Sequence, residues 1–168
     1  VMLVGAMNPC PCGYYGHTKK ECHCTPHQIQ KYVSKVSGPL LDRIDIHVEV
    51  PALEGKDLKT RQTGETSDTL RDKVRAARDI QHKRFNGAKL TVNAQMSNKL
   101  VKKHCVLDGE AETLLHQAMM ELGLSARGYT KILKIARTIA DLDSSDRIRT
   151  EHISEAIQYR TLDRGIWR

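Results

Sequence analysis

The stretch Ser37-Gly38-Pro39-Leu40-Leu41-Asp42-Arg43-Ile44-Asp45 decides how the first third of this chain is expected to fold. A helix before it should stop here, because proline disfavours helical backbone in the residue that precedes it. After Arg43, apolar and polar residues alternate over positions 44–50. A period of two predicts a strand with one buried face, which Pro51 ends.

The residues upstream of this stretch predict a helix and another strand. The helix should run from Thr25 to about Val36, because Thr25 is a good N-cap and Gln28 follows it at the capping-box position. Val1–Met7 is continuously apolar, which is typical of a strand buried on both faces of a parallel sheet. Strand, connection, helix and strand predict a parallel crossover unit. Two strands form no stable sheet alone, so residues 1–51 are expected to be a remnant of an α/β core.

Downstream of Pro51 the sequence predicts a linker over residues 52–66 and an all-α bundle over residues 67–168. The bundle is indicated by apolar residues that recur with helical spacing, and its expected caps are Asp108, Ser125 and Thr150. Its core should be aliphatic, because hydrophobic residues make up 39% of the chain and aromatic residues only 4%. The expected fold is therefore mostly α: two parallel strands with one helix, followed by a helical bundle.

The charge of the chain favours an acidic partner. Lys and Arg total 27 against 20 for Asp and Glu, a net charge of +7, and nucleic acid is the commonest partner of such chains. Two groups of basic residues are candidates to contact phosphates: the segment Arg71–Arg84, and Lys99, Lys102 and Lys103. A solvated helix face is the preferred explanation of each group.

The sequence predicts neither a membrane span nor a secretion signal. No apolar run approaches the roughly 18 residues of a membrane span. Val1–Met7 lacks the preceding charges of a signal peptide. We therefore expect a cytoplasmic protein without a membrane partner. Because no initiator Met opens the sequence, we also expect it to be part of a longer protein.

Four of the five cysteines lie in a Pro- and Gly-rich loop over residues 8–24: Cys10, Cys12, Cys22 and Cys24. Four thiolates are a suitable set for tetrahedral zinc, and metal binding would supply folding energy that so polar a loop lacks. His17, His23 and His27 are near enough to replace one ligand. Free thiols and a disulfide are the alternatives. Cys105 stands alone in an apolar context and is expected to be in the core.

Three segments together carry a resemblance to a known family: Asn8-Pro9-Cys10-Pro11-Cys12-Gly13, the 37–45 stretch, and Ser125-Ala126-Arg127 with the closing helices. They resemble the second half of the magnesium-chelatase-like AAA+ ATPase module of the bacterial ComM/YifB group. The resemblance covers nearly the whole chain and implies that residues 67–168 are an AAA+ lid. It further implies a fragment of a hexameric motor that uses ATP with Mg to remodel or translocate DNA, in branch migration or competence.

The resemblance also implies roles for three residues. Asn8 would be the first sensor of the γ-phosphate, Arg43 an arginine finger acting in trans, and Arg127 the second sensor. The alternatives are a loop-capping Asn8 and an Arg43 paired with Asp42 or Asp45 on the surface. No G-x-x-x-x-G-K-[ST] phosphate loop occurs in the sequence, so this chain alone is not expected to hydrolyse ATP.

Two other functions stay open at this point. One is a magnesium-chelatase ATPase subunit that drives metal insertion into porphyrin, against which the cysteine cluster and the basic charge argue. The other is a non-enzymatic zinc-loop module that binds nucleic acid. For self-association, the resemblance implies a hexameric ring when the protein is intact. Unpaired strand edges predict a dimer or strand swap for the fragment.

Overall fold

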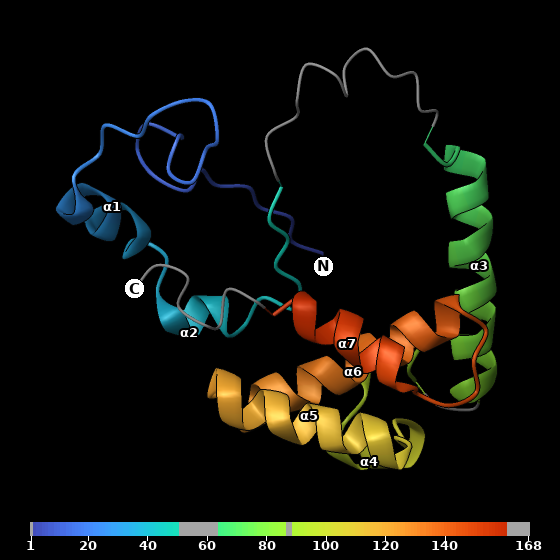
Figure 1. The fold of residues 1–168 in the computed structure, drawn as a ribbon. Coiled ribbons are helices and arrows are strands. Elements are labelled where there is room, and N and C mark those ends of the chain that lie inside the picture. The colour runs from blue at the N-terminus through green and yellow to red at the C-terminus, as the bar shows by residue number, and fades with distance from the viewer. Residues whose placement is uncertain (1, 51–63, 87–88, 161–168) are drawn as a thin grey trace.

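The computed structural model describes residues 2–50, 64–86 and 89–160, and these are mostly helical, as the sequence predicts (Figure 1). The helices are α1 (Pro26–Val33), α2 (Gly38–Leu41), α3 (Ser67–Arg84), α4 (Asn98–His104), α5 (Gly109–Leu122), α6 (Ala126–Leu142) and α7 (Thr150–Gln158), with a 3₁₀ turn η1 (Asn93–Gln95). None of the helices described here combines the length and apolarity that crossing a membrane requires.

Helix ends follow the capping residues closely. Thr25 and Gln28 form the predicted capping box at the start of α1, with Oγ1 of Thr25 3.3 Å from the Gln28 backbone nitrogen. Asp108 and Ser125 cap α5 and α6 through their side chains. One cap prediction is wrong by a residue, since Thr150 is the first residue of α7 rather than its cap. The short α2 was not predicted, and Ser37 caps it.

α6 lies at the centre of the helical bundle. It packs against α3, η1, α4 and α7, and α5 packs on α7 (Figure 1). Ile132, Ala136 and Ala140 of α6 are fully buried, and the core around them is almost entirely aliphatic. Cys105 is buried in this core, as predicted. α3 extends beyond the bundle, so Leu70 and Val74 in its first half remain about half exposed.

The two predicted strands do not form within the described residues. The sole β-type pairing there is an isolated bridge between Leu107 and Ile148. Segments 2–7 and 44–50 have no regular secondary structure, because a strand forms only when the backbone of a neighbouring strand bonds along it. Their apolar side chains are accordingly exposed: Met2 at 89%, Leu3 at 83% and Val50 at 83%. The crossover unit of an α/β core is therefore absent from the described chain.

Segment 44–47 bonds to the end of α7 instead of to a strand. The His47 backbone nitrogen donates to the Tyr159 carbonyl at 2.8 Å, and the Arg160 guanidinium donates to the Ile44 carbonyl. These bonds tie the first third of the chain to the bundle. Most of the predicted linker, and residues 161–168 of the predicted lid, lie outside the described residues.

Candidate functional site

The cysteine-rich loop brings its four thiols together. The Sγ atoms of Cys10, Cys12 and Cys22 are 3.3 to 3.7 Å apart, and that of Cys24 lies with them, all four within 4.8 Å of one another. Four sulfurs bound to zinc at about 2.3 Å in a tetrahedron would be about 3.8 Å apart. The donor set and its spacing therefore fit a tetrahedral thiolate site.

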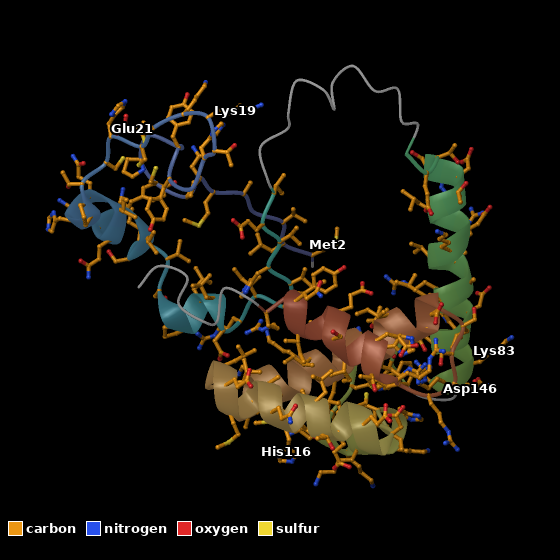
Figure 2. All side chains as sticks on the ribbon, viewed as in Figure 1. Met2, Lys19, Glu21, Lys83, His116 and Asp146 are labelled. Carbon is orange, nitrogen blue, oxygen red and sulfur yellow. The ribbon has the colours of Figure 1, made fainter. Side chains whose placement is uncertain are left out.

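Two tight turns produce this grouping. Gly13 and Gly16 have backbone φ angles of 82° and 78°, which residues other than glycine adopt rarely. The Gly13 backbone nitrogen donates to the Cys10 carbonyl at 3.0 Å, and that of Tyr15 donates to Cys10 Sγ at 3.4 Å. Lys19 and Glu21, labelled in Figure 2, mark the part of the loop between the two cysteine pairs.

The nearby histidines are not among the close ligand atoms in the described residues. His17 is engaged elsewhere, because its Nδ1 accepts from the backbone nitrogens of Lys19 and Lys20 at 3.0 and 3.1 Å. The sequence had left a histidine ligand open. The geometry favours the four cysteines.

Crowding separates the pKa values of the thiols. The pKa of Cys12 is lowered to about 6, chiefly because the Tyr14 backbone N–H donates to its sulfur and the other three thiols also donate to it. For Cys22, the Cys24 backbone N–H favours the thiolate, but burial and the neighbouring thiols outweigh it and raise the pKa to about 12. One thiolate thus forms readily, and further ionisation needs a compensating positive charge.

A second cluster joins the Leu41–Asp45 segment to the start of α6. Arg127, exposed in the first turn of α6, donates to Asp42 Oδ2 at 2.9 Å. The hydroxyl of Ser125, which caps α6, lies 3.2 Å from the other carboxylate oxygen of Asp42. Hydrogen bonding from Arg127 is the main reason why the pKa of Asp42 lies below its ordinary value.

Lys131 holds the same segment one turn further along α6. Its ammonium donates to the Arg43 carbonyl at 2.5 Å and pairs with Asp45 at 2.9 Å. Both carboxylates that flank Arg43 are therefore bound to α6. The sequence offered no signal for these contacts, because the partners lie more than eighty positions apart.

The Arg43 guanidinium is exposed and pairs with neither neighbouring carboxylate. Its Nη1 donates to the Pro39 carbonyl at 2.7 Å, one turn back along α2. Among the described residues Arg43 forms no ion pair. The surface pairing with Asp42 or Asp45 that the sequence left open is thus not observed.

Asn8 is exposed just before Cys10. No hydrogen bond within the described part of the chain joins it to Arg43 or Arg127. Asp42 thus joins the segment of the predicted finger Arg43 to that of the predicted second sensor Arg127, whereas no hydrogen bond among the described residues joins Asn8 to either arginine.

Comparison with known proteins matches both parts of the chain to one family. The family model described as magnesium chelatase, subunit ChlI, matches residues 1–58, and the model of the ChlI C-terminal region matches residues 64–160. The uncharacterized protein YifB of Escherichia coli is 42% identical over 163 residues, and competence protein ComM of Haemophilus influenzae is 41% identical over 163 residues. Each match covers 96% of this chain and 31% of the relative.

A more distant relative is an uncharacterized protein of Mycobacterium tuberculosis. It is 30% identical over 158 residues, which cover 94% of this chain and 31% of the relative. The chain thus spans about a third of the length of the curated relatives that it matches.

Proposed function

Because this chain belongs to the magnesium chelatase family and is similar to its ComM and YifB members, we propose that it is part of an AAA+ ATPase motor of the ComM type. The main support for this proposal is the exposure of Arg43 and its lack of an ion pair among the described residues. Its guanidinium is exposed without an ion pair among the described residues, while α6 binds the carboxylates on either side.

In the proposed mechanism Arg43 acts on a neighbouring subunit. A guanidinium that reaches the nucleotide of the next subunit stabilises charge on the transferring phosphoryl group, which accounts for about 10³ to 10⁵ in rate in comparable enzymes. Anchoring of the Leu41–Asp45 segment to α6 would hold Arg43 ready at low entropic cost. Such a role requires a ring of subunits, so self-association belongs to the proposal.

Arg127 and Asn8 would act on the nucleotide of their own chain. Arg127 would contact the γ-phosphate as the second sensor, exchanging its contact with Asp42 for one with the nucleotide. Asn8 would orient the attacking water or the γ-phosphate. ATP with Mg would bind through a phosphate loop that this sequence does not contain, so we assign turnover to a longer chain. DNA is the substrate that we propose, and the likeness to a competence protein and the net charge of +7 support it.

The exposed apolar residues of segments 2–7 and 44–50 fit the same proposal. In the longer chain, segments 2–7 and 44–50 would pair with further strands of an AAA+ core, which would cover their apolar side chains. In this chain alone, a second copy is the available partner, and we expect dimers or strand exchange. Sedimentation that shows a monomer at every concentration would contradict this part.

Cys10, Cys12, Cys22 and Cys24 would hold one zinc ion, which supplies folding energy to the loop. Reduced thiols also suit a cytoplasmic location. Elemental analysis of the reduced chain should find about one metal per chain. Cys12→Ser should lose it, whereas Cys105→Ser, outside the loop, should keep it. Absence of metal, with four freely reactive thiols in the native state, would refute the site.

The proposed role of Arg43 as an arginine finger is tested in a longer protein that contains this sequence and has the full length of the relatives. Arg43→Ala should remove most ATP turnover while ATP still binds, because the contact is made across the interface. Arg127→Ala should instead weaken nucleotide binding. Subunits with a disabled phosphate loop, mixed with Arg43→Ala subunits, should restore part of the activity, since each supplies what the other lacks. No restoration in rings that demonstrably mix would refute action in trans.

A magnesium-chelatase subunit is the second candidate, because the matching family models carry that description. The identity of 41–42% to ComM and YifB favours the DNA motor. ATPase activity that responds to DNA and not to porphyrin would decide between them.

A further inference from the structure

A basic cavity lies at the end of the helical bundle where α3 meets α6, and neither the four loop cysteines nor Arg43 and Arg127 line it. Its volume is about 520 Å³, within the range of about 300–1,000 Å³ that is common for small-molecule sites. Its walls come from the ends of α3 and α4, from α6, and from the loop that follows α6. Figure 2 labels Asp146 of that loop beside the lower end of α3.

The charged side chains that line this cavity are mostly cationic. Arg84, Lys103, Arg137 and Arg147 line it together with His104, and Asp146 is the single carboxylate on its wall. Arginine and lysine in such number around one space are suited to phosphoryl oxygens, to which a guanidinium donates two parallel hydrogen bonds.

Two of these cations are fixed in place by one buried carboxylate. Asp141, 1% exposed, accepts from Arg84 Nη1 at 2.7 Å and from Arg137 Nε at 3.0 Å. Arg137 also donates to the Asp146 carbonyl at 2.8 Å. A single carboxylate balances only one of the two guanidiniums, so the inner wall keeps a surplus of positive charge.

The other two cations stand at the mouth of the cavity. Lys103 and Arg147 are exposed, and their side chains form no hydrogen bond or ion pair among the residues that the structure describes. They are therefore available to a ligand. The field of the site already acts on His104, whose pKa is lowered by burial and by the charges of Lys103, Arg84 and Arg137.

We propose that this cavity is a binding site for a phosphoryl group, held by Lys103 and Arg147 at the mouth in front of the Arg84–Asp141–Arg137 wall. The group would come from a free polyphosphate-bearing small molecule or from the backbone of a nucleic acid. The site is separate from the proposed ATP-sensing residues. Arg127 and Asp141 are fourteen residues apart on α6, which is about 21 Å along a helix.

The test uses tripolyphosphate as the probe and the whole 168-residue chain, observed by NMR. The ring signals of His104 should shift and saturate as tripolyphosphate is added. Those of His116, on α5 away from the cavity, should not (Figure 2). Lys103→Gln with Arg147→Gln should weaken binding about tenfold or more, because two charge-assisted contacts are lost. The matched control, Lys31→Gln with Lys35→Gln, removes the same charge from exposed positions in and just after α1, outside the cavity, and should change affinity little.

A second arm identifies the source of the phosphoryl group. If a short single-stranded oligonucleotide displaces tripolyphosphate from His104, the ligand is a nucleic-acid backbone. If the oligonucleotide binds the chain without displacing tripolyphosphate, the ligand of the cavity is a free anion. The proposal is overturned if His104 shows no saturable shift, or if both double variants lose affinity equally. Neither result bears on Arg43 or Arg127, so the proposed function is tested separately.

Discussion

Asp141→Asn is the substitution that should most strongly destabilise the bundle. The carboxylate is 1% exposed and bonds to three side chains from α3, η1 and α6: Arg84, Arg137 and Asn93. Asparagine keeps the shape but removes the negative charge, and its amide would point N–H groups at a guanidinium that needs an acceptor. Arg137, itself 2% exposed, would be left as a buried cation without its counter-charge.

The expected loss of unfolding free energy in Asp141→Asn is large because both Asp141 and Arg137 are buried. Breaking a buried ion pair by removal of one partner costs about 3–5 kcal/mol, because the other charge is left uncompensated. At the entropy typical of a bundle of about 100 residues, this lowers the midpoint of thermal unfolding by at least about 12 °C. No comparable loss is expected at a half-exposed pair, which contributes about 0–1 kcal/mol.

Urea unfolding followed by circular dichroism measures the difference, with Asp143→Asn as the matched control. Asp143 lies two residues away and carries the same charge, but its pair with Arg149 is about half exposed on both sides. Its second contact, 3.3 Å from the Nε2 of His152, also leaves the Asp143 side chain 55% exposed. We expect the free energy of unfolding to fall by several kcal/mol in Asp141→Asn and by less than about 1 kcal/mol in the control. Equal effects would refute the argument that one buried carboxylate organises this end of the bundle.

Three further predictions concern single groups. Arg127 lowers the pKa of Asp42, so their contact should stabilise the chain at pH values above the ordinary carboxyl pKa. This stabilisation should be lost as the pH falls through the lower pKa that Asp42 has in the folded chain. Arg127→Gln should raise the pKa of Asp42 in an NMR titration, and an unchanged pKa would disprove the contact. Burial raises the pKa of Cys105 to about 11, so alkylation at neutral pH, mapped by mass spectrometry, should modify it only after unfolding. Gly123 ends α5 at φ 60°, so Gly123→Ala should cost about 1 kcal/mol, whereas Gly109→Ala, at a position with negative φ and open space around it, should not destabilise the chain.

The features that sequence reasoning predicted well are those fixed by neighbours along the chain. Thr25, Asp108 and Ser125 cap helices because their side chains bond backbone groups three residues on. The four cysteines meet because Gly13 and Gly16 allow tight turns within one short loop. Local chemistry of this kind is readable from adjacent residues, whatever the rest of the protein does.

The features that it missed depend on partners far away in the sequence. Alternation over residues 44–50 is a true strand pattern, yet a strand forms only when a neighbouring strand bonds along it, and in the described chain the backbone of this segment bonds to the end of α7 instead. Arg84 and Asp141 are separated by 57 positions, and nothing in either neighbourhood indicates the other. Arg137 is buried against Asp141, and the cavity beside it has no signature in the sequence.

Asp42 shows why the position of a charge along the chain is a poor guide to its partner. Consecutive residues at a helix end point in different directions, so adjacent Asp42 and Arg43 do not face one another. Asp42 therefore pairs with Arg127, 85 positions away, and Asp45 pairs with Lys131. Because Arg127 and Lys131 of α6 pair with these two carboxylates, the exposed Arg43 has no ion-pair partner in the part of the chain that the structure describes. A residue that must stabilise phosphoryl charge on another subunit needs that condition, since a guanidinium already neutralised within its own chain would first have to break that pair.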